Sequence, residues 1–155
     1  NLRVPPKIHI LLWLLCHNKL MSRDNLRKRR IIKPLDCVFC SEVVSSAHLF
    51  FECVVAKQIW IEISEFFYAE LGTNYLSIAR FWPANKKHIA LNSVCACVLC
   101  AMWINRNSHV FNNDIWTDVK RIWRRVLGQS RRWLILFEGP ALAKMETSFR
   151  KSPTS

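Results

Sequence analysis

The sequence predicts a mostly α-helical fold, a small helical domain in which one cysteine-rich loop is the main irregular part. Three observations lead to this prediction. The 155 residues include only three Gly and six Pro, fewer than a chain built from tight β-turns needs. Apolar residues recur at helical spacing in several segments, most regularly after residue 53 and after residue 118. Hydrophobic residues make up 51% of the chain, which indicates a folded core rather than a disordered tail.

The first predicted helices lie near the amino terminus. Pro5-Pro6 opens the first one, because proline is tolerated at a helix start where its missing N–H is not needed. Residues 8–15 are apolar on most of the helix surface, so we expect them at the centre of the core. Ser22 is the expected N-cap of a short second helix over residues 23–30, which Pro34 ends.

Further helical segments follow the cysteine-rich loop. Residues 54–67 carry apolar side chains at helical spacing, and Gly72-Thr73-Asn74 breaks that helix. A short helix is expected within residues 75–82, and a long buried one from Lys86 to about Arg106. Asn112-Asn113-Asp114 is predicted to form a turn that also caps the last helix.

The last predicted helix has two contrasting sides. Its apolar side comprises Val119, Ile122, Trp123, Val126, Leu127, Trp133, Leu134 and Phe137. Its other side carries Lys120, Arg121, Arg124, Arg125, Arg131 and Arg132. Gly139-Pro140 is expected to end the helix. We therefore divide the chain into a domain over residues 1–70, a helical extension over 71–140 and a tail over 141–155 that we expect to be disordered.

The cysteine-rich loop contains a C-x2-C-x7-H-x4-C run formed by Cys37, Cys40, His48 and Cys53. Thiolate and imidazole groups at these separations can reach one tetrahedral zinc ion, which takes sulfur and nitrogen ligands at about 2.0–2.3 Å. Four protein ligands leave no position for water or substrate, so the pattern predicts a zinc-pinned CCHC loop with a structural role. His48 and Cys53 are too far round for one face of a regular helix, so we expect one of them at a helix end. Ser45 or Ser46 is expected to cap the helical turn that carries His48.

Two alternatives to metal binding remain open for these cysteines. Cysteine often packs as a small buried hydrophobic residue, and pairs of cysteines form disulfides. The chain has seven cysteines, an odd number, and no secretory segment, which disfavours a disulfide framework. Cys95, Cys97 and Cys100 lie in an apolar stretch, where we expect free buried thiols rather than a second metal site. Phe50 and Phe51 are expected to pack in the core, with stacking on unpaired bases as the alternative.

The net charge of +12 is concentrated in two parts of the chain. Residues 1–40 carry nine Lys+Arg against two acids (+7), residues 41–90 four against five (−1), and residues 91–155 ten against four (+6). Two basic regions suit a polyanion such as nucleic acid or an acidic membrane surface, and an ordinary solvated surface is the alternative. The candidate phosphate-binding residues are Arg23, Arg27, Lys28, Arg29, Arg30 and Lys33 in the densest run, with Arg124 and Arg125 in the last helix.

Neither a targeting segment nor a membrane span is predicted. Ile89–Ile104 is the longest apolar stretch, but its sixteen residues fall short of the ~20 that a spanning helix needs. Free thiols indicate a reducing compartment, so the nucleus or the cytoplasm is the expected location. The sequence has no Gly-rich phosphate loop, Ser–His motif or paired-carboxylate cluster, so we predict neither catalysis nor a small-molecule substrate.

An ordered set of motifs resembles the zinc-binding domain that follows the reverse transcriptase in plant LINE-type retrotransposons. The motifs are Pro5-Pro6-Lys7, Trp13, Arg23-Asp24-Asn25-Leu26 with Arg29, Cys37-Val38-Phe39-Cys40, His48-Leu49-Phe50-Phe51-Glu52-Cys53 and Trp60. A later Trp103-Ile104-Asn105-Arg106-Asn107 with Val110-Phe111 is similar to the segment that usually follows this domain. The resemblance covers residues 3–67 well and 95–112 more loosely.

The resemblance implies a structural zinc ion held by Cys37, Cys40, His48 and Cys53, beside a polymerase that copies element RNA. The chain begins at Asn1 rather than Met and has no polymerase domain, so we expect a piece of a retrotransposon polyprotein. We predict a non-catalytic zinc-binding module with RNA or DNA as its partner, bound through backbone phosphates. The alternatives are a scaffold module that docks to a reverse transcriptase domain, a membrane-associated helix at 89–104, and a degenerate fragment without selected function.

Overall fold

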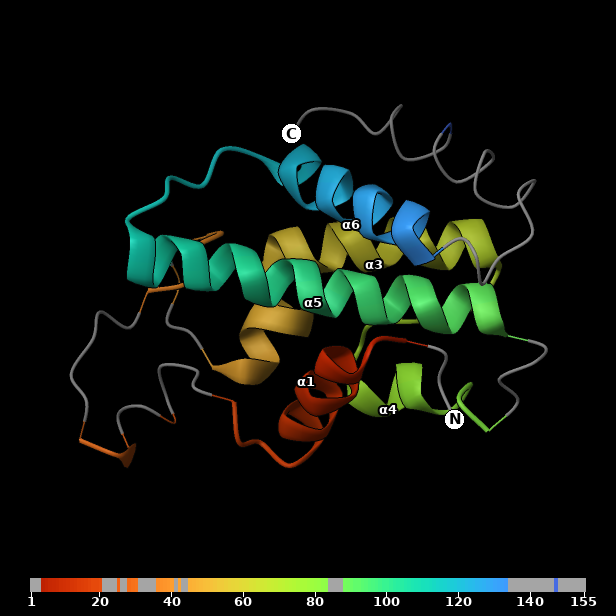
Figure 1. Cartoon of the computed structure of the whole chain (residues 1–155), viewed down its shortest axis with the longest axis horizontal. Coiled ribbons are helices and arrows are strands. Elements are labelled where there is room, and N and C mark those ends of the chain that lie inside the picture. The colour runs from red at the N-terminus through yellow and green to blue at the C-terminus, as the bar shows by residue number, and fades with distance from the viewer. Residues whose placement is uncertain are drawn as a thin grey trace.

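The longest apolar stretch of the sequence forms the central helix of the fold, α5 (Ile89–Asn112), in the computed structural model of this chain (Figure 1). The structure describes residues 4–20, 25, 28–30, 36–40, 42, 45–83, 88–133 and 147. The other elements of this part are the helices α1 (Pro6–Cys16), η1 (His48–Glu52), α3 (Val54–Phe67), α4 (Tyr75–Ala79) and α6 (Val119–Trp133). All six are helical, so the predicted mostly α fold is confirmed.

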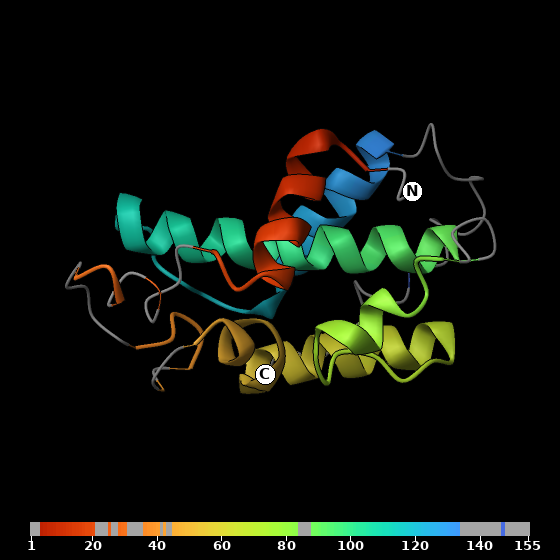
Figure 2. The same ribbon diagram turned by 90° about the horizontal axis from the view of Figure 1, so that it is seen from below.

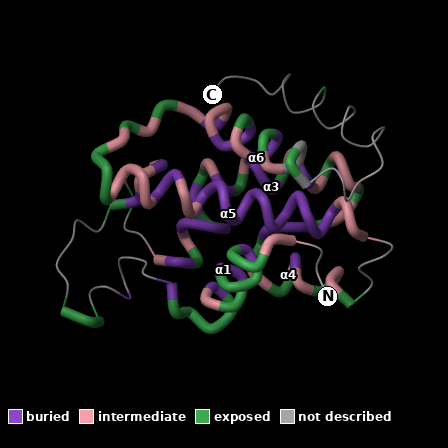
Figure 3. The backbone as a smooth tube through the Cα atoms, in the orientation of Figure 1, coloured by how far each residue is buried: buried purple, intermediate pink, exposed green. Residues whose placement is uncertain are grey.

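The helices form layers around α5. Figure 2 shows α1 and α6 on one side of α5, and η1, α3 and α4 on the opposite side. The backbone of α5 lies close to those of α6, α1 and η1. A helix that is covered from both sides is buried round most of its circumference, and Figure 3 shows α5 buried along most of its length. The core therefore follows this one helix.

The burial of α5 also explains its composition. By length and composition alone this helix could cross a membrane, yet 78% of its most apolar window is buried inside the structure. An apolar helix surrounded by other helices is the normal core of a helical protein. The predicted buried helix is thus confirmed, although it continues past Arg106 to Asn112.

The end of α5 differs from the prediction. Asn112 is still helical, and Asn113 ends the helix in the left-handed conformation at φ 55°. The N–H of Asp114 then donates to the carbonyl oxygen of Ser108 at 3.2 Å, a backbone hydrogen bond that closes the end of the helix. An irregular segment follows, and α6 begins only at Val119. The turn therefore ends α5, and the prediction that it caps the last helix is wrong.

The first helix is less central than its composition predicts. Ile8, Leu11, Leu12 and Leu15 are buried, as expected for one face of an amphipathic helix. The opposite face is exposed, however, and Ile10 and Trp13 keep 60% and 50% of their surface in contact with solvent. The core thus covers only one side of α1. The prediction that residues 8–15 lie at the centre of the core is therefore confirmed only for one face of the helix.

The segments around α3 and α4 follow the sequence closely. Helix α3 buries Ala56, Ile59, Trp60 and Ile63, in agreement with the predicted helical spacing. It ends at Tyr68, which adopts the left-handed conformation. Within the predicted break at 72–74, the side-chain oxygen of Asn74 accepts a hydrogen bond from the N–H of Ser77 and so caps α4.

Helix α6 packs its apolar side onto α5. Val119, Ile122, Trp123, Val126 and Leu127 are buried, which confirms the predicted apolar side over these positions. The continuation of that side at Leu134 and Phe137 lies outside the described residues, as do Gly139-Pro140, the tail apart from residue 147, and most of the predicted helix over 23–30 with Ser22 and Pro34.

One hydrophobic core spans the predicted boundary at residue 70. Buried side chains of α1, η1 and α3 belong to the same cluster as those of α5 and α6. A hydrogen bond from the Tyr75 hydroxyl to the Leu12 carbonyl oxygen, 3.3 Å long, adds a direct link between α4 and α1. The division into residues 1–70 and 71–140 stays a prediction, which the unfolding behaviour of the protein can test.

Candidate metal centre

The backbone that carries His48 is a tight helical turn with an unusual hydrogen-bond pattern. The hydroxyl of Ser45 accepts the His48 N–H at 3.0 Å, so the predicted cap is confirmed for Ser45. From His48 to Glu52 the chain is a π-helix, η1, and the N–H of Cys53 donates to the carbonyl oxygen of His48 at 2.8 Å. A bond from residue i to residue i+5 defines this wider turn.

The π-turn explains how His48 and Cys53, five residues apart, can bind the same ion. Two residues five apart lie on different faces of an α-helix, but the i to i+5 bond places Cys53 directly beyond His48. Cys53 itself follows η1 and is the N-cap residue of α3, which confirms that one of the two ligands lies at a helix end. The π-helix itself was not predicted. π-Turns of this kind are rare and occur mostly at functional sites.

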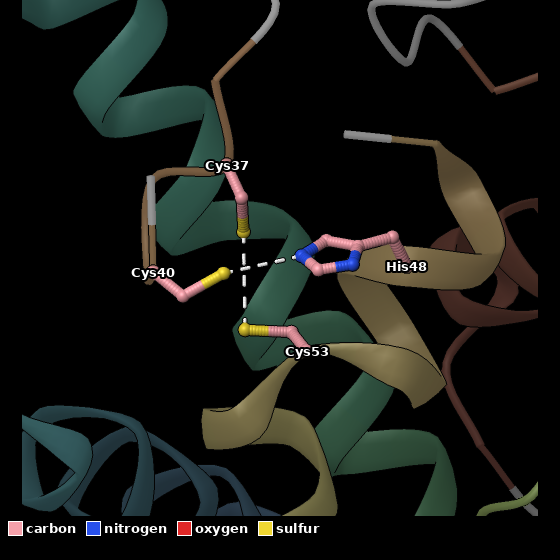
Figure 4. A group of neighbouring side chains, drawn as sticks. All are labelled: Cys37, Cys40, His48 and Cys53. Atoms are coloured by element: carbon pink, nitrogen blue, oxygen red, sulfur yellow. Dashed lines mark hydrogen bonds between the residues drawn. The ribbon is translucent and has the colours of Figure 1, made fainter. Parts of the chain in front are cut away.

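The other two cysteines come from a turn that faces this helix boundary. Residues 38–40 form the turn, and the N–H of Cys37 donates to the carbonyl oxygen of Glu42 at 2.6 Å. Figure 4 shows the four side chains pointing toward a common centre. The distance from Cys37 Sγ to Cys53 Sγ is 3.9 Å, and that from Cys40 Sγ to His48 Nε2 is 3.2 Å. All four ligand atoms lie within 4.8 Å of one another.

These separations fit a tetrahedral zinc ion. Two thiolates bound at ~2.3 Å and at a tetrahedral angle lie about 3.8 Å apart, and a thiolate and an imidazole nitrogen lie about 3.6 Å apart. The sulfur pair agrees with the first value, and the sulfur–nitrogen pair needs a shift of a few tenths of an ångström. Three sulfurs and one nitrogen are also the donor atoms that structural zinc prefers. The cluster thus fits a structural Zn²⁺.

The protonation of the thiols shows why a cation suits this cluster. The hydrogen bond between Cys53 and Cys37 raises the pKa of Cys53 and lowers that of Cys37, and burial also raises the pKa of Cys53. Burial raises the pKa of Cys40 as well. Three thiolates this close repel one another, so without a cation the group retains protons. Zinc needs the thiolate form, and its binding at this site therefore releases protons.

Aromatic residues next to the cluster residues in sequence pack into the core. Phe50 and Phe51 are buried, which confirms that they pack in the core. The indole N–H of Trp60 donates to the carbonyl oxygen of Phe50 at 2.6 Å and so ties α3 to η1. Between Cys37 and Cys40, the ring of Phe39 lies edge-on to that of Trp116 with centroids 4.6 Å apart. This last contact joins the metal loop to the segment before α6.

Fold and cluster together define a class: a helical domain organised around a closed Cys3His metal site. Residues 1–60 match a family model described as zinc-binding in reverse transcriptase. The matched segment includes all four cluster residues, so the zinc binding in that description agrees with the Cys3His geometry of the site. No curated protein and no solved structure matches the chain.

The predicted phosphate-binding residues are only partly described. Lys28, Arg29 and Arg30 are exposed, whereas Arg23, Arg27 and Lys33 lie outside the described residues. On α6, Arg124 is exposed and Arg125 is half-buried. Lys7 lies beside these residues, because the start of α1 approaches the basic side of α6. The sequence gives no sign that Lys7 lies near α6, since a contact between the first and last helices depends on how both pack on α5.

The remaining cysteines behave as the sequence predicts. Cys95, Cys97 and Cys100 form no disulfide and are buried in α5. Burial raises the pKa of Cys95 and of Cys100, as expected for thiols surrounded by apolar groups. Among the residues that the structure describes, the only candidate metal cluster is the one at 37–53.

Proposed function

We propose that the protein is a non-catalytic, zinc-ordered module that binds the phosphate backbone of RNA or DNA. The observation that carries this proposal is the charge of α6, which has six Lys or Arg and no Asp or Glu in its fifteen residues. A polyanion is the natural partner of such a helix. The match to a family model of zinc binding in reverse transcriptase supports a nucleic acid as that polyanion.

The structure suggests a simple mechanism for this binding. Zinc holds the turn with Cys37 and Cys40 against the junction of η1 and α3, while exposed Lys and Arg side chains contact phosphates. Contacts to phosphate fix the position of a protein on nucleic acid and carry little sequence information. We therefore propose binding with high salt dependence and low sequence preference.

The origin and location of the protein belong to the same proposal. The motif order supports descent from the polyprotein of a plant LINE-type retrotransposon, where the module works beside a reverse transcriptase domain. The seven cysteines form no disulfide, which supports a reducing compartment, either the nucleus or the cytoplasm. A closed site with four protein ligands leaves no open metal position for substrate, which supports a non-catalytic role.

A specific observation favours a second candidate, a module that docks to a polymerase domain. Ile10 and Trp13 on α1, and Val54 and Ile61 on α3, are exposed large apolar side chains. Exposed apolar groups of this size are frequent in protein interfaces. They are scattered over two helices on opposite sides of α5, so the charge of α6 supports nucleic acid more directly.

Anisotropy titrations separate the two candidates. Zinc-loaded protein is titrated into a labelled 20-nucleotide single-stranded RNA and a labelled 20-base-pair DNA duplex between 50 and 300 mM KCl. We expect binding of both, with an affinity that falls steeply and linearly on a log–log plot against salt. Absence of binding at 50 mM KCl, or an affinity that salt does not change, would exclude the phosphate-binding proposal.

A further inference from the structure

A pocket of about 460 Å³ lies where three helices meet. Lys7 of α1 and Ile104 of α5 line it together with one side of α6. Figure 2 shows α1 and α6 on the same side of α5, which is the arrangement that brings Lys7 to the last helix. Its volume is within the ~300–1,000 Å³ of ordinary small-ligand sites. The pocket lies outside the metal cluster and draws its lining mainly from residues beyond the family match.

The lining is strongly cationic. It contains Lys7, Arg121, Arg124, Arg125 and Arg132, and none of its residues is an Asp or Glu. Asp114 forms an ion pair with Arg121, and the Arg121 Nη1 donates to the carbonyl oxygen of Ile115 at 2.6 Å. That carboxylate therefore offsets only part of the charge. Like charges gathered around one pocket repel one another, and an anion within it would remove that repulsion.

The spacing of α6 accounts for this concentration of charge. Arg121, Arg125, Gly128 and Arg132 follow one another at intervals of four, three and four residues, which places them on one face of the helix. Three of these four positions carry an arginine, and Gly128 occupies the third. Guanidinium groups present paired N–H donors that match phosphate oxygens, so this face suits successive phosphates better than a single carboxylate.

Gly128, the position on this face without an arginine, is the second observation that points to a ligand. Gly128 lies inside a helix, where glycine costs about 0.5–1 kcal/mol relative to alanine. Packing does not require it, because a Cβ at this position would meet no atom within 4 Å. Its φ is not positive either, since Gly72 is the only glycine among the described residues with a positive value. The glycine therefore serves neither packing nor backbone geometry, and its effect is to keep the pocket open.

We propose that this α1–α5–α6 pocket is a phosphate-binding site that takes adjacent phosphate groups of a nucleic-acid strand. The inference rests on the proposed function for the identity of the ligand and deepens it by assigning the contact to one pocket. Lys7 supplies a point charge from α1, and the arginines of α6 supply bidentate donors along the strand. Gly128 lets the strand approach the helix backbone closely.

The first test separates pocket shape from overall charge. Gly128→Ala and Gly128→Leu leave the net charge unchanged and progressively fill the pocket, and both residues favour helix more than glycine. With a labelled twelve-nucleotide oligouridylate RNA, we expect a graded weakening that reaches about tenfold or more for the leucine variant at 100 mM KCl, which is the loss of about one good phosphate contact. Circular dichroism verifies that α6 remains helical in both variants.

A matched pair of charge reversals forms the second test. Arg124→Glu removes a pocket cation, whereas Lys57→Glu makes the same change in charge at an exposed position of α3, on the opposite side of α5. We expect the first variant to bind RNA several-fold more weakly than the second and to show a salt slope lower by about one. Equal affinities of these two variants, with wild-type binding by Gly128→Leu, would overturn the pocket while leaving the proposed function intact.

Inorganic pyrophosphate distinguishes the failure of the pocket from the failure of the proposed function. At constant ionic strength, pyrophosphate should raise the melting temperature of the wild-type protein and leave that of Gly128→Leu nearly unchanged. If the wild type shows this rise but binds no RNA, the pocket is a site for small phosphate compounds and the nucleic-acid function is excluded. If pyrophosphate affects both proteins equally or neither, the pocket is not a phosphate site.

Discussion

Gly72 has a role that only the three-dimensional contacts reveal. It adopts φ +85°, and a Cβ at this position would overlap the indole of Trp60. We expect Gly72→Ala to lower the free energy of unfolding, because it adds overpacking of about 1–3 kcal/mol to a left-handed-backbone cost of about 1–2 kcal/mol. Because the Trp60 indole also holds η1, the variant should bind zinc more weakly as well. Urea denaturation of the zinc-loaded protein measures the loss of stability.

Gly128→Ala is the matched control for this substitution. It makes the same chemical change in a helix where the new methyl group meets no neighbour within 4 Å. We expect it to raise the free energy of unfolding by about 0.5–1 kcal/mol, since alanine is the better helix former. A similar loss of stability in both variants would show that Gly72 has no special packing role.

Replacement of a cluster cysteine should remove a zinc ligand, whereas replacement of another cysteine should not. Cys53 is fully buried among the ligand atoms, whereas Cys16 is exposed on α1. We expect Cys53→Ser to abolish stoichiometric zinc, which contributes an apparent ~10–16 kcal/mol in structural sites. Cys16→Ser should retain one zinc ion per chain. Metal analysis of the purified proteins decides the matter, and a full complement of zinc in Cys53→Ser would contradict the assignment.

At the scale of elements, one ring contact links the metal loop to the carboxy-terminal helix pair. Phe39 lies between two of the cluster cysteines and contacts Trp116, which lies in the irregular segment before α6. Removal of zinc should therefore increase hydrogen exchange both in the metal loop and in residues 113–118. In Phe39→Ala, removal of zinc should no longer increase exchange in residues 113–118, because this variant lacks the ring contact with Trp116. Exchange confined to residues 36–53 in the wild type would refute this coupling.

Between α5 and α6, the charged carboxylate of Asp114 stabilises the folded protein. The hydrogen bonds from Arg121 and from Ser108 hold the pKa of Asp114 below its ordinary value of 3.8. A lowered folded-state pKa means that the stabilisation is complete above the unfolded-state pKa and is lost as the pH falls through the folded-state value. We expect Asp114→Asn to lower the melting temperature at pH 7 but not at a pH well below 3.8. Melting curves at both pH values test this, and a constant difference between them would contradict it.

At the scale of the whole molecule, the sequence predicts most of what short-range chemistry determines. Helical spacing locates α3 and the buried side of α6, and the spacing of Cys37, Cys40, His48 and Cys53 identifies the metal cluster before any coordinates. These features depend on neighbours within a few turns or on ligand atoms close in sequence. Local pattern is enough to predict them.

The features that the sequence does not predict depend on packing between distant segments. The exposed face of α1 follows from the arrangement of the helices around α5, although that face carries the large apolar residues Ile10 and Trp13. The π-turn at η1 brings His48 and Cys53 to one site, and the helix propensities of its residues do not predict it. Lys7 joins the arginines of α6 only because α1 and α6 pack on the same side of α5. In each case tertiary structure decides the outcome.

The shared core leads to a final prediction about cooperativity. Cys37, Phe39 and Cys53 belong to the same buried cluster as the side chains of α5 and α6. We therefore expect the zinc-loaded protein to unfold in one calorimetric transition, with equal calorimetric and van't Hoff enthalpies. Zinc binds only the folded state, so a chelator should move that single transition to a lower temperature rather than create a second one. Two separate transitions, of which only one responds to zinc, would instead establish residues 1–70 and 71–140 as independent domains.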